Sequence, residues 1–456
     1  MKNLSRKYSG INTIVWVFIT VLAITGCSSS TNDGWTELFN GKDLSGWKQL
    51  NGEATFEVVD GMIVGTTVAD TPNSFLCTEQ TYSDFIFEVE LLVEDNMNSG
   101  IQFRSESKPD YQNGRVHGYQ SEVDPSERAW SAGIFDEARR GWLYPLDLNP
   151  DARSAFKNDE WNHYRIECIG PSIKTWLNGV PVAHIYDDMT PEGFIALQVH
   201  SIRDASMEGQ QIKWKNIRIK TENLEPSPDE DIYVVNLLPN NLSEAEKAQG
   251  FELLFDGTSA DNFRSVRSEE FPSRGWEVKD GVLTVHASGG DPEKKGGDII
   301  TRREFGPFEL KFDFNFSEGA NSGIKYGLGN HGTSIGLEYQ ILDDENHPDA
   351  KNGINGNRTL ASLYDVIPAD KQARFVNGPG NWNRGRIVVY PDGKAQHWLN
   401  GRKVLEYERG GDYFNAQVAL SKFADLEGFG MAANGPIHIQ DHNDEVHFRS
   451  IKIREF

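Results

Sequence analysis

Hydrophobic and polar residues alternate with a period of two along many short segments of the chain. The pattern is clearest at residues 85–91 and 308–314, and it recurs at residues 164–168 and 212–215. Successive side chains of a strand point to opposite faces, so each segment predicts a strand with one buried face. Asp-Gly and Asn-Gly pairs between such segments favour hairpin turns. The pattern therefore predicts an all-β protein with antiparallel sheets and little helix.

A set of short motifs occurs twice in the same order, which indicates two copies of one domain. The pairs are Phe39-Asn40-Gly41 with Phe255-Asp256-Gly257, Asn98-Ser99-Gly100-Ile101 with Asn321-Ser322-Gly323-Ile324, Trp176-Leu177-Asn178-Gly179 with Trp398-Leu399-Asn400-Gly401, and Gln198-x-His200 with Gln440-x-His442. The offset grows from 222 residues (398 − 176) to 242 (440 − 198), so the second copy has an insertion of 20 residues (242 − 222) between Gly401 and Gln440. Antiparallel strands in copies of roughly 200 residues predict a two-sheet sandwich of the jelly-roll type in each.

Composition and motif positions divide the 456 residues into five segments. Residues 222–249 contain three prolines and many acidic residues, which is typical of a linker, and the capping-box pattern from Ser243 to Glu246 predicts a short helix near its end. The expected segments are a lipoprotein signal peptide at 1–26, a tether at 27–33, the first sandwich at 34–221, the linker with its helix at 222–249 and the second sandwich at 250–456.

The N-terminal segment predicts export and lipid anchoring. Three basic residues precede an apolar run at residues 11–24, a combination typical of a secretory signal. The alternative, a single transmembrane anchor, is disfavoured because a membrane span needs ~20 apolar residues. Residues 22–27 resemble a bacterial lipobox, in which Cys27 is acylated and becomes the first residue of the mature chain. We therefore expect a protein of the cell envelope, on its periplasmic or outer-membrane side, that touches the membrane through its N-terminal lipid only.

Charge and cysteine content exclude several classes of protein. The chain has 68 Asp and Glu residues against 45 Lys and Arg, a formal net charge of −23, and loss of residues 1–26 with their three cations makes it −26 (−23 − 3). So acidic a chain does not suit nucleic-acid binding, which depends on basic patches. Three cysteines exclude a disulfide-dense scaffold and a zinc site of four thiolates. Cys77 and Cys168 could form a disulfide or remain as two buried thiols.

The most informative stretch for chemistry is residues 118–124 of the first copy. On a strand, Gln120, Glu122 and Asp124 share one face. Two carboxylates with an amide beside them can act as acid, base and substrate anchor, and their mutual repulsion would raise one pKa. The alternative is a polar strand that faces solvent. Other residues could converge on the same face, namely Gln102, Arg104, Gln198 and His200 on neighbouring strands, Asp136, Arg139, Arg140 and Trp142 in a loop that could hold a sugar, and Lys174 beside Trp176.

The second copy carries a different charge layout at the matching positions. The exchanges are Glu338 for Gln120, Gln340 for Glu122 and Lys325 for Gln102. The insertion also brings Lys422 near Gln440 and His442. The two copies could therefore act on different substrates, or one of them could be a binding module.

No motif in the chain requires a cofactor. A Gly-rich phosphate loop, a G-x-S-x-G elbow and an H-E-x-x-H zinc motif are all absent from the sequence. The run of Asp343, Asp344 and Glu345 could hold a divalent cation, but calcium takes roughly 6–8 oxygen ligands and the sequence shows no complete ligand loop. We therefore expect no required metal and a small carbohydrate as the partner.

Together these motifs resemble the family of 3-keto-disaccharide hydrolase domains, over nearly all of residues 34–456. The stretches that carry the resemblance are Gly118-Tyr119-Gln120-Ser121-Glu122-Val123-Asp124 and residues 38–41, 44–47, 98–101, 133–137, 161–162, 176–179, 193–200, 439–442 and 448–453. The resemblance implies concanavalin A-like sandwiches and an enzyme that cleaves 3-keto-glucosides by 1,2-elimination. Hydration of the resulting 2-hydroxy-glucal would complete a net glycosidic hydrolysis.

The implied reaction needs a base, an acid and a group that stabilises an enolate oxygen, because the ketone at C3 acidifies the hydrogen on C2. In the first copy the hypothesis assigns acid–base work to Glu122, Asp124 and His200, enolate stabilisation to Arg104, and anchoring of hydroxyls to Gln120 and Gln198. In the second copy it assigns acid–base work to Glu338, Asp343 and His442, with Lys325 or Lys422 as the cation. Further candidate substrate contacts are Asp136, Arg139, Trp142, Lys174, Gln340 and Gln440.

Two other functions stay open at this point. One is a non-catalytic, lipid-tethered carbohydrate-binding protein. The other is a conventional glycoside hydrolase with paired carboxylates, which suits Glu122 and Asp124 but not the second copy, where Gln340 replaces one acid.

Overall fold

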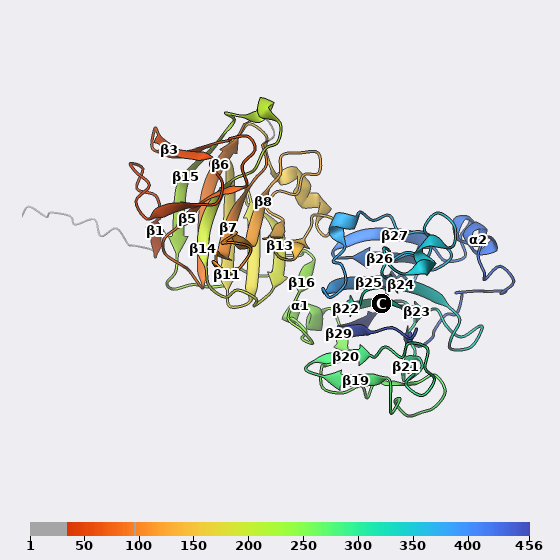
Figure 1. The fold of residues 1–456 in the computed structure, drawn as a ribbon. Helices are drawn as coiled ribbons and strands as arrows, with labels where there is room; N and C mark the ends of the chain where they lie inside the picture. Colours follow the sequence, from red (N-terminus) through yellow and green to blue (C-terminus); the bar gives the residue numbers. More distant parts are fainter. Residues whose placement is uncertain (1–33, 95–96) are drawn as a thin grey trace, which may run out of the picture.

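The structure is a computed structural model of the chain and describes residues 34–94 and 97–456. The expected signal peptide, the tether and the lipidation site at Cys27 lie outside the described residues. Each copy folds into two β-sheets, and the two sandwiches lie side by side with strand β16 and helix α1 between them (Figure 1). The all-β fold class predicted from the sequence is confirmed.

The first sandwich consists of a nine-stranded and a seven-stranded sheet. The nine-stranded sheet runs in the order β16 (Val234–Asn236), β13 (Val180–Tyr186), β12 (Ser172–Leu177), β11 (Asn162–Ile169), β6 (Phe85–Val93), β15 (Gln211–Lys220), β4 (Met62–Thr66) and β3 (Thr55–Val59), with β1 (Trp35–Glu37) paired to β15. The seven-stranded sheet runs in the order β10 (Gly141–Tyr144), β9 (Ile134–Glu137), β8 (His117–Val123), β7 (Ser99–Glu106), β14 (Phe194–Val199), β5 (Ser74–Thr78) and β2 (Trp47–Leu50).

The second sandwich repeats this plan with smaller sheets. Its eight-stranded sheet runs in the order β19 (Trp276–Lys279), β20 (Val282–Val285), β29 (Val446–Glu455), β22 (Phe308–Phe316), β25 (Asn383–Val389), β26 (Lys394–Leu399) and β27 (Arg402–Glu408), with β17 (Glu252–Leu253) paired to β29. Its five-stranded sheet runs in the order β18 (Phe263–Ser265), β21 (Ile299–Thr301), β28 (His438–Ile439), β23 (Asn321–Tyr326) and β24 (Leu337–Leu342).

Helix is scarce in the described part of the chain. The α-helices are α1 (Glu244–Ala248) and α2 (Asp412–Ala419), and the 3₁₀ turns are η1 (Pro150–Ala155), η2 (Ala205–Met207), η3 (Pro348–Lys351) and η4 (Ala373–Phe375). Helix α2 lies in the stretch that the repeat offsets mark as an insertion. No helix within residues 34–94 or 97–456 combines the length and the apolar character that a membrane crossing requires.

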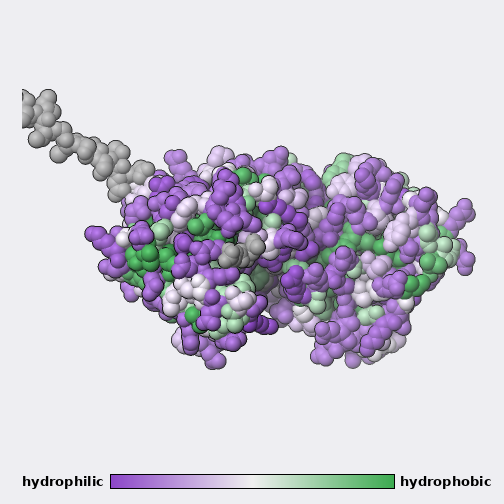
Figure 2. All heavy atoms as spheres, turned by 90° about the horizontal axis from the view of Figure 1, so that it is seen from above, coloured by the Kyte–Doolittle hydropathy of each residue, from purple (hydrophilic) through white to green (hydrophobic). Residues whose placement is uncertain are grey.

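Each sandwich has its own apolar core. Strand β22 shows how the alternating pattern builds it, because Phe308, Phe312 and Phe314 are buried while Lys311 and Asp313 between them are half-buried. Burying such an aromatic side chain contributes about 1.5–3 kcal/mol. The outer surface is mostly hydrophilic in the view of Figure 2, as the large excess of acidic residues requires.

The two cysteines that the structure describes are separate free thiols. Cys77 lies in β5 of the seven-stranded sheet and Cys168 in β11 of the nine-stranded sheet. Both are fully buried, and burial raises the pKa of Cys168 to about 12. Neither thiol is a nucleophile at neutral pH. Because both thiols are free, the alternative of a disulfide between them does not apply.

The linker is an ordered bridge between the two sandwiches. Its strand β16 pairs in parallel with β13 of the first sandwich, with Val234 opposite His184. Next to it, the backbone carbonyl of Tyr233 accepts a hydrogen bond of 2.8 Å from the hydroxyl of Tyr144, while the ammonium group of Lys311 lies 4.7 Å from the centre of the Tyr233 ring. One residue of the linker therefore contacts both copies.

A buried ion cluster fixes helix α1 to the second sandwich. The Ser243 hydroxyl accepts from the backbone N–H of Glu246, and the Glu246 carboxylate accepts from the backbone N–H of Ser243, which is the capping box that the sequence indicates. The same carboxylate is 1% exposed and lies 2.8 Å from the Nζ atom of Lys452 and 3.3 Å from that of Lys311. Burial acts to raise the pKa of Glu246, but the two ammonium groups outweigh it and hold the pKa below its usual range.

We predict that Glu246→Gln destabilises the second sandwich by about 3–5 kcal/mol, because it leaves the ammonium of Lys452 buried without its counter-ion. The measurement is denaturant unfolding followed by tryptophan fluorescence. Glu244→Gln on the same helix is the control, since its carboxylate is exposed and its loss should change stability by less than about 0.5 kcal/mol. The pKa of Glu246 is depressed, so its contribution is present at neutral pH and the difference between the two variants should shrink as the pH falls through that depressed value. Equal stability of both variants at pH 7 would contradict this assignment.

Candidate functional site

The seven-stranded sheet of the first sandwich forms part of the wall of an open hollow of 1140 Å³, called the first hollow below. Six of the residues singled out in the sequence line it, namely Gln120, Glu122, Asp124, Trp142, Gln198 and His200. Gln120 and Glu122 lie on β8, and Tyr119 and Val123 of the same strand face the apolar core. The expectation that the polar face of this strand meets the Gln-x-His segment in one cavity is therefore confirmed.

A chain of side-chain amides leads to the carboxylate of Glu122. The Nε2 atom of Gln102 on β7 donates to Oε1 of Gln120 at 2.6 Å, and Nε2 of Gln120 donates to Oε2 of Glu122 at 2.8 Å. Nε2 of Gln198 on β14 also donates to Oε1 of Gln120, at 3.1 Å. Three adjacent strands thus fix the orientation of one carboxylate, because each amide is held by its neighbour.

Glu122 is 5% exposed and its carboxylate is held by neutral and positive groups together. Its Oε1 atom accepts from the Asn98 amide at 2.9 Å and from the Arg128 guanidinium at 3.3 Å. Burial raises the pKa of Glu122 to about 7, although Asn98, Arg128 and Gln120 all favour the charged form. A carboxyl group with a pKa near neutrality can both accept and return a proton under physiological conditions.

Asp124 lines the first hollow, but its oxygens are occupied. Oδ2 accepts from Nε of Arg128 at 2.6 Å and from the backbone N–H of Trp130 at 3.1 Å, and Oδ1 accepts from the Ser126 hydroxyl at 2.6 Å. Asp124 therefore orients Arg128, whose guanidinium joins the two carboxylates and lies 5.1 Å from the centre of the Trp142 ring. Arg128 could not be predicted from the sequence, because it follows β8 in a loop where alternation gives no signal.

Two groups in the first hollow are available to a ligand. Oε1 of Gln198 is buried and has no hydrogen-bond partner among the described residues. His200 donates from Nδ1 to the backbone carbonyl of Ser201 at 2.8 Å, which leaves Nε2 for a ligand. An unsatisfied buried acceptor is costly, so a ligand hydroxyl at Gln198 would be favourable.

The expectation that Arg104 faces the substrate is wrong. A β-bulge interrupts the pairing of β7 with β8 after Phe103, and Arg104 has a left-handed φ of 43°. Its buried guanidinium donates to the backbone carbonyls of Ser83 at 2.7 Å and Gly170 at 2.9 Å and pairs with Asp84 at 2.9 Å. The bulge turns the side chain away from the hollow, and Arg104 instead joins the ends of the two sheets.

Asp136 and Arg139 also lie outside the first hollow, contrary to expectation. Both line a cavity of 400 Å³ at the boundary between the two sandwiches, which adjoins the first hollow because Trp142 and Arg374, among others, line both. The fully buried carboxylate of Asp136 accepts from Nε of Arg139 at 2.7 Å and from Arg140, and Arg139 donates to the Thr190 hydroxyl at 2.6 Å. Arg140 also pairs with Asp187, so two carboxylates balance the two guanidiniums and hold the shape of the loop.

The expectation that Lys174 contacts the substrate is also wrong. It lies on β12 of the nine-stranded sheet, away from the hollow, and is 5% exposed. Its ammonium donates to the backbone carbonyl of Ser227 at 2.7 Å and to the carboxylate of Asp229 at 2.8 Å. Lys174 therefore holds the start of the linker against the first sandwich.

The second sandwich has a hollow of 360 Å³ at the equivalent place, called the second hollow below. Six of the residues expected there line it, namely Glu338, Gln340, Lys325, Lys422, Gln440 and His442. Burial raises the pKa of Glu338, while the ammonium groups of Lys325 and Lys422 act to lower it. Burial likewise lowers the pKa of Lys422, whose Nζ lies 4.2 Å from the centre of the Tyr364 ring. Tyr364 also lines the second hollow, although no sequence pattern predicted it there.

The second hollow repeats the unpaired amide oxygens of the first. Oε1 of Gln340 and Oε1 of Gln440 are buried atoms with no hydrogen-bond partner in the part of the chain that the structure describes. Nε2 of Gln340 donates to Asn321 at 3.2 Å, so the amide is oriented. Both copies therefore offer glutamine carbonyls to a ligand.

The expectation that Asp343 works in the second hollow is wrong. Its carboxylate accepts from the backbone N–H groups of Gly319 at 2.8 Å and Glu345 at 3.1 Å and from the Asn346 amide at 2.8 Å. Asp343 is absent from the residues that line the hollow. Its oxygens hold the loop that follows β24, which is a structural role.

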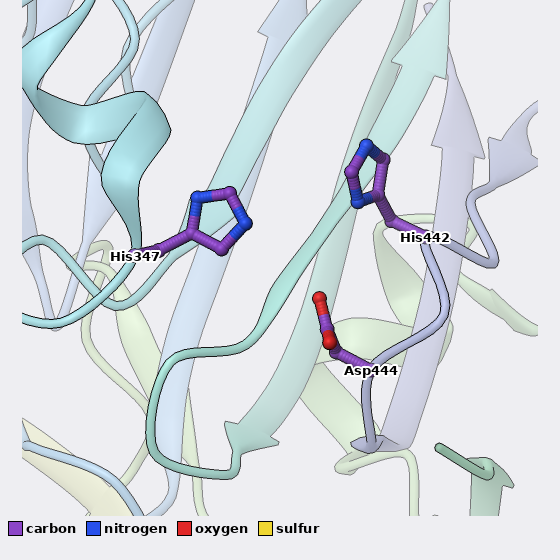
Figure 3. A group of neighbouring side chains, drawn as sticks. All are labelled: His347, His442 and Asp444. Carbon is purple, nitrogen blue, oxygen red and sulfur yellow. The ribbon is translucent and has the colours of Figure 1, made fainter. Parts of the chain in front are cut away.

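A group of three side chains at the edge of the second hollow has the composition of a metal site. The ligand atoms of His347, His442 and Asp444 lie within 4.8 Å of one another, and the Asp444 carboxylate points into the space between the two imidazole rings (Figure 3). Nδ1 of His347, however, accepts from the backbone N–H of Asp349 at 3.1 Å, so a neutral His347 ring carries its hydrogen on Nε2. A cation would need His347 to give up that hydrogen bond, whereas His442 is equally available to a substrate.

The strand register explains the repeated Asn-Ser-Gly-Ile motif. Gly100 pairs with Glu122 and Gly323 with Gln340, which confirms that acid and amide have exchanged places between the copies. A Cβ atom on Gly100 would lie 2.7 Å from Cγ of Gln120, and one on Gly323 would lie 2.9 Å from Cδ of Glu338. A glycine is needed at both positions because the neighbouring polar side chain occupies the space above it.

The comparisons with known proteins agree with the duplication. The sequence model of the 3-keto-alpha-glucoside-1,2-lyase-like domain matches residues 34–220 and again residues 250–454. A curated relative, the 3-keto-disaccharide hydrolase of Bacteroides thetaiotaomicron, is 36% identical over 233 residues, which cover 45% of this chain and 79% of the relative.

Two solved structures from Parabacteroides distasonis ATCC 8503, each assigned as a glycosyl hydrolase, are also similar to this chain. They are 28% and 26% identical, cover 48% and 45% of this chain and 100% and 99% of their own, and have TM-scores of 0.42 and 0.34. The family model alone covers most of the described residues, in the two segments where the structure has its two sandwiches. The chain therefore belongs to the 3-keto-alpha-glucoside-1,2-lyase-like domain family and carries two tandem copies of that domain.

Proposed function

We propose that the chain is an enzyme that cleaves 3-keto-glucosides by eliminating the group at C1 and then hydrating the product. The family and the name of the relative support action on such sugars. The observation that carries the proposal is common to both hollows. Each hollow holds one buried glutamate whose pKa burial raises, next to a cation and to at least one glutamine carbonyl that has no hydrogen-bond partner among the described residues.

In the first hollow, Glu122 acts as the base that removes the proton from C2. The electron pair of the C2–H bond moves towards the C3 ketone and gives an enolate, whose oxygen accepts hydrogen bonds from Arg128. The enolate then forms the C1=C2 double bond and expels the group at C1. The oxygen of that group takes the proton from Nε2 of His200, whose ring starts the cycle protonated on both nitrogens. The carbonyl of Gln198 accepts from a sugar hydroxyl, while Gln120 holds Glu122 in place through its amide.

Hydration reverses the direction of proton flow. Water adds its oxygen to C1 of the 2-hydroxy-glucal, and C2 takes back the proton that Glu122 holds. The water's remaining proton returns to His200. Elimination and hydration together consume one water molecule and restore every protein group to its starting state.

The second hollow supports the same scheme with different residues. Glu338 takes the role of the base, His442 that of the acid, and Lys422 or Lys325 that of the cation beside the enolate. An ammonium whose pKa is lowered by burial gives up a proton more readily than a guanidinium does, so Lys422 can also donate one.

Elimination is favoured over conventional glycoside hydrolysis by the surroundings of Asp124. A hydrolase with paired carboxylates needs both of them to face the scissile bond. In the first hollow the Arg128 guanidinium bonds Asp124 at 2.6 Å and Glu122 only at 3.3 Å. The other two donors to Glu122 are neutral amides, so Glu122 is the carboxylate that we assign to catalysis. Asp124 is a positioning residue for Arg128.

We also propose that the mature chain starts at Cys27 and is held at the cell envelope by the lipid on that residue. The basic and apolar N-terminal segment and the small residues before Cys27 support this cellular location. A surface with a large excess of acidic groups would be repelled by anionic lipid, so the lipid is the membrane contact.

We predict that Glu122→Gln and Glu338→Gln each lower the release of the leaving group from a 3-keto-glucoside by roughly 10²- to 10⁴-fold for the hollow concerned, and that the double variant loses it entirely. The assay follows product formation from a glucoside and from its 3-keto form with each variant. Release from both sugars would indicate ordinary hydrolysis, and release from neither by the wild-type chain would indicate a carbohydrate-binding protein. Full activity of the double variant would contradict the assignment of the base.

We predict that elimination in the Glu338→Gln variant becomes faster as the pH rises through about 7, the value to which burial raises the pKa of Glu122. The raised pKa means that the carboxyl keeps its proton up to neutrality, and only the ionised form can accept the C2 proton. The measurement is kcat against pH from 5 to 9. A kcat that rises nowhere between pH 5 and 9 would contradict the assignment of Glu122 as the base.

We predict that Gly100→Ala lowers the activity of the first hollow by roughly 10- to 100-fold, because the new methyl group displaces Gln120 and misplaces Glu122. The cost in stability should be about 1–3 kcal/mol, as for other overpacked sites. Gly378→Ala is the control, since the described structure leaves open space around its Cβ position. The variants are compared by kcat/KM in the Glu338→Gln background and by thermal unfolding. Equal activity of the two alanine variants would contradict the packing argument.

A further inference from the structure

The first hollow is lined by residues of both sandwiches. Most of its wall belongs to residues 51–201, but Arg374 and Phe375 also line it, and they lie in the 3₁₀ turn η4 of the second sandwich. The second hollow differs in this respect, because every residue that lines it comes from the second sandwich itself.

Phe375 is anchored from both sides. Its ring packs with the apolar core of the first sandwich and lies 5.8 Å from the Trp130 ring, although the residue belongs to the second copy. Its backbone carbonyl accepts from the amide of Asn400 at 2.9 Å, and the guanidinium of Arg402 lies 4.6 Å from its ring. The side chain is 9% exposed, so its position is fixed by packing.

Further contacts hold the two sandwiches together next to this turn. Nη2 of Arg384 donates to the backbone carbonyls of Trp142 at 3.2 Å and Leu143 at 2.9 Å. Arg402 forms an ion pair with Asp147. The wall formed by Arg374 and Phe375 is thus fixed relative to Trp142, which lines the same hollow.

The guanidinium of Arg374 has N–H groups that remain available to a ligand. Its Nε atom donates to Gln372 at 2.8 Å, and its guanidinium lies 4.8 Å from the Phe375 ring. Among the ion pairs of residues 34–94 and 97–456, none involves Arg374, whereas Arg115 across the hollow is paired with Glu137. The remaining N–H groups of Arg374 can donate to a ligand in the hollow.

A short series of contacts connects this wall to the reacting centre. Arg128 lies 3.3 Å from the Glu122 carboxylate and 4.9 Å from the centre of the Trp130 ring, and Trp130 contacts Phe375. The wall is therefore one aromatic layer away from the proposed base. Arg128 also lies 5.1 Å from the centre of the Trp142 ring, and both residues line the first hollow together with Arg374, so a ligand at the wall shares one cavity with the proposed base.

We infer that the second sandwich completes the first hollow, and that Arg374 and Phe375 form a subsite for a leaving group that is itself a saccharide. This inference rests on the proposed function of the first hollow. The guanidinium of Arg374 offers donors to the hydroxyls and ring oxygen of a sugar. The Phe375 ring is buried against Trp130 and the Arg402 guanidinium, so it holds the turn that carries Arg374 in place. A small leaving group such as methanol would reach neither residue.

The test compares two substrates in the full-length Glu338→Gln chain, in which the first hollow acts alone. One is a 3-keto-glucoside with a methyl leaving group and the other is a 3-keto-disaccharide. Arg374→Ala should lower the ratio of kcat/KM for the disaccharide over the methyl glycoside by at least tenfold, chiefly through KM. Phe375→Leu, which keeps an apolar side chain in the first core, should lower the same ratio. Arg267→Ala is the control, because this exposed arginine of the second sandwich lines neither hollow.

A second comparison separates the subsite from a general loss of structure. In the Glu122→Gln chain, where the second hollow acts alone, Arg374→Ala should leave the substrate ratio where it was, because Arg374 does not line the second hollow. An equal loss with both substrates, or the same loss in both backgrounds, would overturn the inference and leave the proposed function standing.

A binding measurement tests the subsite independently of the proposed reaction. Tryptophan fluorescence with an unreacted disaccharide and its monosaccharide measures the occupancy of the wall beside Trp130 and Trp142. If the wild-type chain cleaves neither keto substrate, the proposed function fails, and weaker disaccharide binding by Arg374→Ala would still support the subsite. If Arg374→Ala binds both sugars as the wild type does, the subsite is absent.

Discussion

Burying a carboxylate on the face of a β-sheet costs free energy unless neighbouring groups supply hydrogen bonds, and the first hollow is built around that constraint. Glu122 receives bonds from Asn98, Gln120 and Arg128, and these partners come from β8, from the chain before β7 and from the loop after β8. The amide groups are neutral, so they orient the carboxylate without removing the whole effect of burial on its pKa. A set of stronger cationic partners would have fixed the charge, and the group would then have been a poor proton acceptor.

The second sandwich meets the same constraint with a different arrangement of charged groups. Exchange of acid and amide on the equivalent strand moves the carboxylate to Glu338, next to Lys325 and Lys422. Two flexible ammonium groups take the place of one guanidinium that is held by its own aspartate. The glycine on the neighbouring strand is retained, since the side chain at the Gln120 or Glu338 position needs that space in both copies. The duplication has therefore kept the backbone of the site and changed the order of its charges.

The sequence predicts the parts of this protein that depend on strand periodicity. Alternation shows which residues of β8 share a face, and the repeats show the two copies, the insertion and the equivalence of Glu338 with Gln120. Alternation fails where the strand is irregular. Arg104 follows a bulge, so its side chain leaves the face that counting assigns to it. Asp136, Arg139, Lys174 and Asp343 have the right chemistry, but each is used by a loop or linker whose path no local pattern gives. Arg128, Tyr364 and Arg374 lie in such loops and were missed for the same reason.

Arg374 shows why the two copies have to be considered together. A single sandwich of this kind presents an open hollow, and whatever stands at its edge decides how much of a ligand is held. In this chain the edge of the first hollow is a turn of the second copy, inserted against the first core by Phe375 and kept in place by Arg384 and Arg402. The second hollow has no further domain beside it in the described residues, so its ligand is held by one sandwich only. Under the proposed function, the two related sites would therefore differ in the length of sugar they hold, because the packing between the domains adds a wall to the first hollow and not to the second.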